Sequence, residues 1–235
     1  MDLSCAIRSN LERAMEAVAS ARAAAGLPDG PGAVSVMAVT KNHPPYVVLA
    51  AVEAGIRLVG ENRVSEGGRK IAAVGRDRAE FHLIGPLHRG EVRQAVRDFH
   101  WIDSVAGAGI VAEIARRSAG RIAPGILLEV NTSGEPSKHG FAPDAGELEK
   151  VVIECRSSGL EPAGLLTVGP LAVGERASRS AFALLRSIRD EVGARTGLPL
   201  RELSMGMSDD FIWAVMEGAT TVRLGRFLLG ERPGR

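Results

Sequence analysis

A lysine directly follows the first apolar, strand-like run of the chain. The run "VSVMAVT", residues 34–40, is rich in β-branched side chains, and Lys41 comes next, before Asn42, His43 and two prolines. A partly buried amine of this kind exists in part as the neutral nucleophile, and such lysines condense with aldehydes to form Schiff bases. A solvated lysine at the rim of the fold is the alternative, and the strand pattern alone does not decide between the two. His43 fits a loop residue better than a general base.

Two turns near the end of the chain are candidates for binding a phosphate group. In "LSMGMSDDF", residues 203–211, a strand enters a turn, and Ser208 is predicted to cap a helix with two aspartates in its first turn. In "VRLGR", residues 222–226, Gly225 follows a strand and allows a ligand to approach the backbone closely. Exposed backbone N–H groups at such turns bind phosphate. A plain helix cap explains the first turn equally well.

Eight strand-like runs alternate with amphipathic helical stretches, which predicts parallel βαβ units and a closed (β/α)8 TIM barrel. An open doubly wound sheet is the alternative. Apolar residues at helical spacing from Leu3 to Val18 predict an extra N-terminal helix, which would cap the barrel and end at Gly26. No break in composition divides the chain, so a single domain is predicted over 1–235. The predicted strands are 34–40, 56–62, 81–85, 101–105, 126–133, 163–169, 201–206 and 221–225.

Polar residues and glycines gather where the predicted strands end. In a parallel barrel these ends share one face, where active sites form, and strands seven and eight often supply a phosphate site. A phosphate site there and a lysine on strand one together indicate a phosphorylated aldehyde, of which pyridoxal phosphate is the common case. The residues concerned include Lys41, Glu61, Asn62, Gly85, Asp103, Asn131, Thr167, Ser204, Ser208 and Arg223.

The composition of the 235 residues, 45% hydrophobic and 24% charged, is that of an ordinary globular protein. The net charge of +1 provides no field that would attract nucleic acid or an anionic membrane. No apolar run approaches the ~20 residues that span a bilayer, and no signal peptide is apparent, so a cytoplasmic location is expected. Cys5 and Cys155 are expected to be free thiols, and no metal site is predicted.

Several motifs occur together in one order and spacing along the chain. They include "AVTKNHPP", "VGENRVSEG", "FHLIGPL", "VNTSGEPSKHGF", "GLLTVGP" and "LSMGMSDDFIWAVMEGATTVRLG". In this order and spacing the chain resembles the YggS/PROSC family of pyridoxal phosphate homeostasis proteins over essentially its whole length. The fold of that family resembles the N-terminal barrel domain of alanine racemase, so the resemblance implies the same barrel here.

The resemblance also implies roles for individual residues. Lys41 is expected to hold pyridoxal 5′-phosphate (PLP) as an aldimine, Asn62 to lie beside the cofactor ring, and Arg223 to face the pyridine nitrogen. The expected phosphate site consists of Ser204, Ser208 and Gly225, with the backbone amides of Met207 and Arg226.

The chain departs from the family pattern at three places. Arg226 stands where the family usually has threonine or serine, so its guanidinium either adds a charge-assisted bond to the phosphate or points outward. Residues 88–91, "HRGE", replace a stretch that usually resembles "QSNK", and Arg63 replaces a common aromatic residue. The last two changes concern partner or ligand contacts at the rim of the site more than the cofactor.

An arginine at the pyridine nitrogen predicts carriage of PLP in place of catalysis. Because arginine keeps its proton, the ring nitrogen stays unprotonated and the ring becomes a weak electron sink. The predicted function is therefore non-catalytic PLP homeostasis, with delivery to apo-enzymes by a monomer or weak homodimer. A small PLP-dependent amino-acid racemase is the alternative, but it needs acid/base groups on both faces of its substrate. Tyr46, the single tyrosine, is expected to pack at a helix start and not to serve as the second of these groups. A barrel enzyme that binds a phosphate group without PLP is the third alternative.

Overall fold

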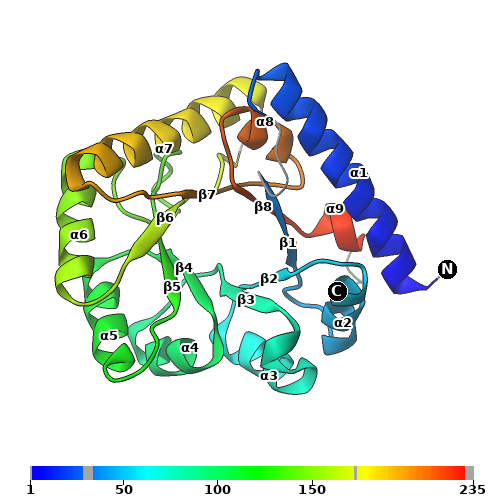
Figure 1. Ribbon diagram of the computed structural model, residues 1–235, viewed down its shortest axis with the longest axis horizontal. Coiled ribbons are helices and arrows are strands. Elements are labelled where there is room, and N and C mark those ends of the chain that lie inside the picture. Colours follow the sequence, from blue (N-terminus) through cyan, green and yellow to red (C-terminus); the bar gives the residue numbers. More distant parts are fainter. Residues whose placement is uncertain (1, 29–33, 172–173, 231–235) are drawn as a thin grey trace.

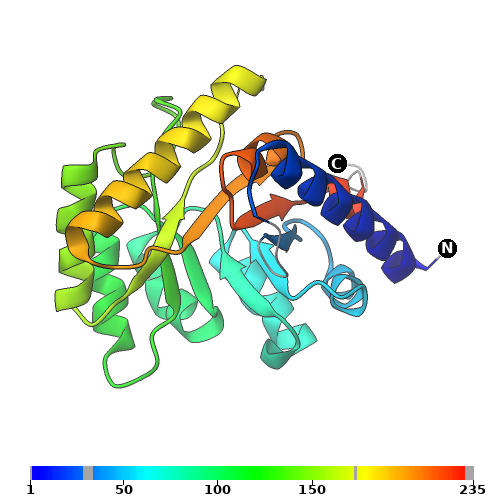
Figure 2. The same ribbon diagram turned by 45° about the horizontal axis from the view of Figure 1, so that its top comes forward.

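The computed structural model describes residues 2–28, 34–171 and 174–230. Within these ranges eight parallel strands pair in chain order and close into a barrel, with the helices outside it (Figures 1 and 2). The predicted (β/α)8 barrel is therefore confirmed. The domain predicted over 1–235 also covers residues 1, 29–33, 172–173 and 231–235, which lie outside the described ranges.

The strands alternate with helices along the described chain. The strands are β1 Ser35–Val39, β2 Leu58–Glu61, β3 Glu80–Leu83, β4 Trp101–Val105, β5 Gly125–Glu129, β6 Pro162–Leu166, β7 Glu202–Met207 and β8 Thr221–Leu224. The α-helices are α1 Leu3–Ala24, α2 Pro45–Glu53, α3 Val64–Val74, α4 Val92–Asp98, α5 Ala108–Ser118, α6 Ala145–Ser157, α7 Glu175–Thr196, α8 Phe211–Met216 and α9 Arg226–Leu229. Two 3-10 turns, η1 Arg76–Arg78 and η2 Arg89–Glu91, precede β3 and α4.

Strands β5 and β6 end earlier than the apolar runs predict. The predicted strands 126–133 and 163–169 extend past Glu129 and Leu166, where the structure ends the strands. Val130 still donates its N–H to Leu166 O at 2.8 Å, but its ladder pairing is an isolated bridge to Phe141 in the following loop. The residues after these strands therefore turn into loops at the mouth of the barrel.

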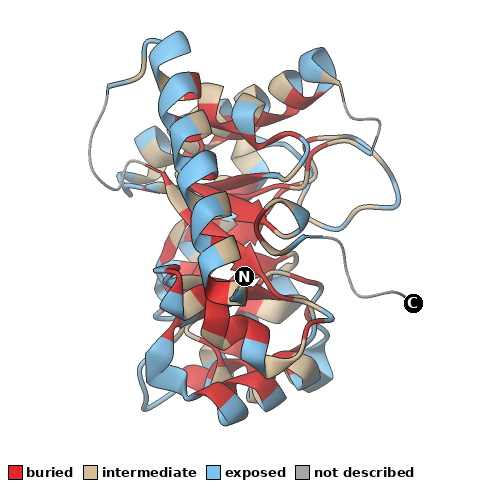
Figure 3. Cartoon of the chain, turned by 90° about the vertical axis from the view of Figure 1, so that its right-hand side faces the viewer, coloured by how far each residue is buried: buried red, intermediate tan, exposed pale blue. Residues whose placement is uncertain are grey.

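Helix α1 lies in the outer ring of helices and does not cap an end of the barrel. Its buried face, which includes Ile7, Ala14 and Val18, packs toward α2, α8 and α9, while its outer face is exposed (Figures 1 and 3). Helix α9 has only four residues, and α1 packs against it as well as against α2 and α8. The predicted helix end is confirmed, since α1 stops at Ala24 and Gly26 adopts a φ of 66°.

The hydrophobic core lies between the barrel and its helices. Phe81, Phe99 and Phe182 are fully buried there. Cys155 is also buried, which raises the pKa of its thiol to about 12, while Cys5 is exposed and both are free. Among the described residues, no helix combines the length and apolar character needed to cross a membrane.

Close approach of two strands requires a glycine in β6. A Cβ on Gly164 would lie 2.0 Å from Glu202 O in β7, so Gly164→Ala must push the paired strands apart. We expect this change to lower the free energy of unfolding by about 3 kcal/mol. Urea denaturation measures the effect.

The control is Gly109→Ala in α5, where an added Cβ meets nothing within 4 Å. It should leave stability unchanged or raise it by about 0.5 kcal/mol. Equal stabilities for the two variants would contradict the proposed crowding between β6 and β7.

Candidate functional site

Residues at the carboxyl ends of the strands line a cavity of about 400 Å³ at one mouth of the barrel. Ser204 is the one residue of the predicted set that does not belong to this lining: it is 1% exposed and lies against Arg223. The predicted residues that line the cavity are Lys41, Asn62, Met207, Ser208, Arg223, Gly225 and Arg226.

Pairing of the first and last strands brings Lys41 close to the end of β8. Strand β1 runs parallel to β8 with Met37 opposite Arg223 and Ala38 opposite Leu224. Because side chains alternate along a strand, Met37 and Val39 share the inward face of β1, and Lys41 lies in the turn two residues after the strand ends. Val39 and Lys41 both line the cavity.

Arg223 is a buried cation in the barrel interior. It is 4% exposed, and its guanidinium donates to Ser204 Oγ at 2.8 Å and to the carbonyl oxygen of Thr167 at 2.7 Å. Burial lowers the pKa of Arg223, and the nearby carboxylates of Asp103, Asp210 and Glu129 oppose that shift. The two hydrogen bonds fix the plane of the guanidinium in the cavity wall.

Glu129 is a buried carboxyl group beside this cation. It is 8% exposed, lines the cavity at the end of β5, and has a pKa raised by burial, against the opposing charges of Arg223 and His139. Glu129 is absent from the predicted site, because its position on an inward strand face depends on the closed barrel. Among the described residues, no cluster of three or more His, Cys, Asp or Glu could hold a metal ion.

The turn after β7 differs from the prediction. Ser208 does not cap α8, which begins at Phe211; its Oγ instead accepts the Phe227 N–H at 3.2 Å. The Met207 N–H donates to Asp210 Oδ1 at 2.6 Å, so this amide is already engaged. The carboxylate of Asp210 accepts this bond at the end of β7 and does not cap α8. The local pattern therefore predicted a helix cap that the structure does not contain.

The Arg226 side chain pairs with a carboxylate at the rim. Its Nη2 donates to Asp209 Oδ2, and both side chains are more than half exposed. Of the two alternatives left open by the sequence, this arrangement corresponds to the guanidinium that points outward.

Asn62 is held in the cavity wall by a neighbouring glycine. A Cβ on Gly85 would lie 2.2 Å from Asn62 O, so the backbones after β2 and β3 can approach this closely only because position 85 is glycine. Both residues line the cavity. Glycine at position 85 is therefore a packing requirement.

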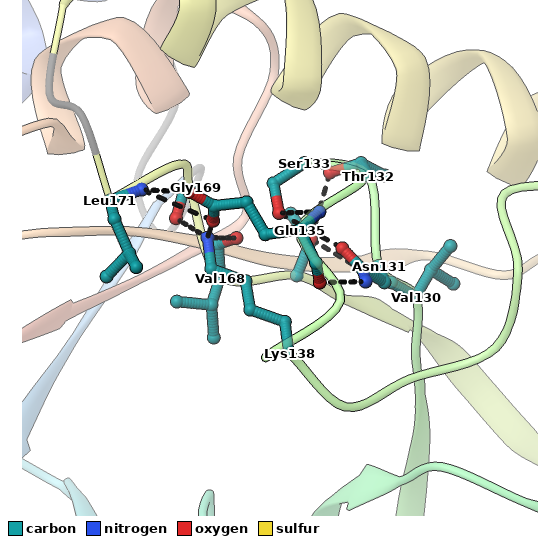
Figure 4. Close-up of polar contacts among 10 residues, drawn as sticks. Val130, Asn131, Thr132, Ser133, Glu135, Lys138, Val168, Gly169 and Leu171 are labelled. Carbon is teal, nitrogen blue, oxygen red and sulfur yellow. Dashed lines mark hydrogen bonds and ion pairs between the residues drawn. The ribbon is translucent and has the colours of Figure 1, made fainter.

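Lys138 joins two loops at the cavity rim, as Figure 4 shows. Its Nζ donates to the carbonyl oxygens of Val168 and Gly169 and pairs with Glu135 Oε2 at 2.6 Å. Glu135 in turn accepts the Leu171 N–H at 3.2 Å. Lys138 is absent from the predicted site, and its spacing of three from Glu135 is the only signal for it in the sequence.

Two residues near Lys41 have different surroundings. His43 is buried and lines the cavity. Tyr46 lies in the first turn of α2, as predicted, but is 62% exposed, so its ring is not packed in the core.

Ionisation of Glu129 should make stability depend on pH. Its folded-state pKa is raised above the ordinary 4.5, so the stability gained from the neutral form is complete below pH 4.5 and lost as pH rises through the folded-state pKa. Glu129→Gln removes this loss. The free energy of unfolding of the unsubstituted protein, minus that of the variant, should therefore fall between pH 4.5 and 8 in urea titrations.

Glu16→Gln on the exposed face of α1 controls for the loss of a surface charge. A difference that rises with pH would instead mean that Arg223 stabilises Glu129 as a carboxylate in the folded state.

Comparison with known proteins agrees with the fold. The model of the alanine racemase N-terminal domain matches residues 5–233. The chain is 36% identical over 229 residues to the pyridoxal phosphate homeostasis protein of Pseudomonas aeruginosa, which covers 96% of both chains. It is 34% identical over 224 residues to that of Aquifex aeolicus, covering 94% of this chain and 96% of the relative.

A solved structure, PipY of Synechococcus elongatus with PLP bound, is 31% identical with a TM-score of 0.80, and the match covers 95% of this chain and 100% of that one. The chain therefore belongs to the family of pyridoxal phosphate homeostasis proteins, whose barrel is that of the alanine racemase N-terminal domain.

Proposed function

We propose that the protein binds PLP through Lys41 at the mouth of the barrel and takes part in PLP homeostasis without substantial turnover. Relatives that carry this function in their names match nearly the whole chain, and the PipY structure with PLP bound supports the same cofactor. The observation on this chain that carries the proposal is the cavity where Lys41, Arg223 and Ser208 meet.

The donors in the cavity suit a phosphorylated aldehyde. Lys41 offers an amine, and Ser208 keeps its O–H donor because the bond from Phe227 N–H uses only an oxygen lone pair. A Cβ on Gly225 would meet only Val39 within 4 Å, at ordinary contact distance. Protein packing therefore does not explain Gly225, whereas close approach of a ligand to its backbone does.

Each predicted residue receives a proposed role. Lys41 binds the aldehyde, Asn62 lies beside the ring and Arg223 donates to the ring nitrogen. The phosphate is held by Ser208 and by the backbone at positions 225 and 226, with less from Met207, whose amide is bonded to Asp210. We propose that Ser204 acts indirectly, because its hydroxyl accepts a bond from Arg223.

The environment of Arg223 favours carriage. When bound, PLP supplies an aldehyde to the lysine and, with a protonated ring nitrogen, an electron sink for carbanions. Arg223 gives up no proton to the ring nitrogen. Its bonds to Ser204 and Thr167 fix the plane of its guanidinium in the cavity wall. The chain's own residues thus favour binding of the cofactor over activation of a substrate.

The racemase alternative has less support. It requires an acid/base group on each face of the bound amino acid, and Lys41 could serve one of them. Tyr46, the single tyrosine of the sequence, is exposed on α2 and is not among the described residues that line the cavity.

We also propose that the cofactor is passed to apo-enzymes. Met207 is 40% exposed and Arg226 is 54% exposed, so the rim of the cavity is accessible from solvent. Exchange at such a rim needs only one copy of the chain, which fits the predicted monomer or weak homodimer.

Lys41→Ala should abolish the visible absorbance band that lysine-bound PLP gives. Lys138 also lines the cavity, but its Nζ is bonded to Glu135 and to two backbone carbonyls. Spectra of the purified protein with added PLP, recorded before and after dialysis, measure the band. Lys150→Ala, at an exposed position of α6, is the matched control and should retain it.

A missing band in the unsubstituted protein would contradict both PLP functions and leave the phosphate-binding barrel enzyme. If the band is present, sustained racemisation or decarboxylation of a panel of amino acids would contradict carriage. Transfer of PLP to an apo-enzyme without such turnover is the expected result.

Arg226→Thr should leave PLP affinity within about two-fold of the unsubstituted protein, because the guanidinium is paired with Asp209 and the backbone amide is kept. Ser208→Ala, which removes a proposed phosphate donor, should weaken binding about ten-fold. Absorbance titration with PLP measures both. A clear loss of affinity in Arg226→Thr would show that the guanidinium contacts the phosphate.

A further inference from the structure

A network of charged side chains holds the peptide units on both sides of Lys41. Lys70 Nζ donates to Thr40 O at 2.6 Å, which fixes the peptide plane before Lys41. Glu66 Oε1 accepts the Asn42 N–H at 2.6 Å, which fixes the plane after it. The two anchors are joined, because Lys70 Nζ also binds Glu66 Oε1 at 2.7 Å. These planes set φ and ψ of Lys41, and hence the direction in which its side chain leaves the backbone.

The conformation of Asn42 shows that the network acts against a local preference. Among the described residues other than glycine, Asn42 alone has a positive φ, 64°. Left-handed backbone is disfavoured for residues with a Cβ, although less for asparagine than for most. The bond from Asn42 N–H to Glu66 stabilises this turn directly after Lys41.

The Lys70–Glu61 pair of the network is buried, whereas Glu66 is partly exposed. Lys70 and Glu61 are 4% and 0% exposed, and Lys70 Nζ donates to the two Glu61 carboxylate oxygens at 2.8 and 3.0 Å. Burial raises the pKa of Glu61, although the bonds from Lys70 and Thr40 oppose it. Burial acts on the pKa of Glu66 in the same direction, but bonds from Lys70 and Asn42 outweigh it and lower that pKa.

Such a network contributes little to net stability. Desolvation of a buried ion pair offsets much of its attraction, and well-packed apolar residues often do as well. The bonds of this network converge on the two peptide units that flank the candidate nucleophile. A geometric role therefore explains the network better than a purely stabilising one.

We propose that Glu66 is a positioning residue which, with Lys70, holds the backbone of Lys41 so that its amine meets the aldehyde of the cofactor. This inference rests on the proposed function, because it assigns Lys41 the covalent bond. In that step Lys41 Nζ bonds to the aldehyde carbon, two N–H protons leave with the carbonyl oxygen as water, and a C=N bond remains.

The test compares two ligands that differ only at the reacting carbon. PLP can bond to Lys41, whereas pyridoxine 5′-phosphate carries an alcohol there and reports only the ring and phosphate contacts. Glu66→Ala should weaken PLP binding about ten-fold, because a misplaced amine loses the covalent bond. Binding of pyridoxine 5′-phosphate, measured by calorimetry, should stay within about two-fold because Glu66 is not among the described residues that line the cavity.

Two further variants complete the comparison. Glu66→Gln keeps an oxygen that accepts the Asn42 N–H and should restore most of the PLP affinity. Glu191→Ala breaks another i,i+4 ion pair, with Arg195 on the exposed side of α7, and should change neither affinity. If Glu66→Ala fails to fold, Glu66→Met preserves helix propensity at this partly exposed position, and the same pair of affinities decides the question.

If Glu66→Ala lost affinity for the two ligands equally, Glu66 would have a general structural role. If its PLP affinity were unchanged, Glu66 would not position Lys41. Either result overturns the inference while the proposed function stands. Absence of the visible band in the unsubstituted protein would overturn the proposed function, and this inference with it.

Discussion

The pairing of β1 with β8 is the constraint on which the rest of the structure depends. A parallel sheet left open would expose unpaired N–H and C=O groups on two edge strands, and ring closure removes both edges. The register of this closure sets Met37 opposite Arg223 and brings Lys41 toward Gly225. Lys41 and the turn at Gly225, which we propose holds the phosphate, come from opposite ends of the sequence, so the site exists only because the barrel is closed.

Two buried cations, Arg223 and Lys70, hold groups at the cavity in fixed positions. Arg223 is held by Ser204 and Thr167, and Lys70 is held by Glu61 and Glu66. Each arrangement buries charge that costs free energy to desolvate, and each fixes the direction of a group at the cavity. Hydrophobic burial between the outside of the strands and the surrounding helices offsets this desolvation cost.

Local patterns predicted the elements well where the local signal was strong. The eight strands, the first helix and the gathering of polar residues at strand ends follow from periodicity and from glycine and proline positions. The same reasoning failed at Ser208, because Asp210 folds back onto the Met207 amide in place of a helix cap. The role of Ser204 at the phosphate, which the family resemblance implies, stays a prediction, and its hydroxyl accepts a bond from Arg223. Such pairings depend on neighbours that are distant in sequence.

The sequence by itself determined the barrel class, the lysine after the first strand, the glycine-containing turns and the family resemblance. These depend on short-range spacing and on residue types, which are already present in the unfolded chain. Only the tertiary structure decided that Glu129 faces the cavity, that Lys138 joins two loops at its rim, and that Arg226 pairs with Asp209. It also linked Lys70 to the backbone before Lys41. These contacts depend on barrel register and on the direction of each side chain, which ring closure fixes.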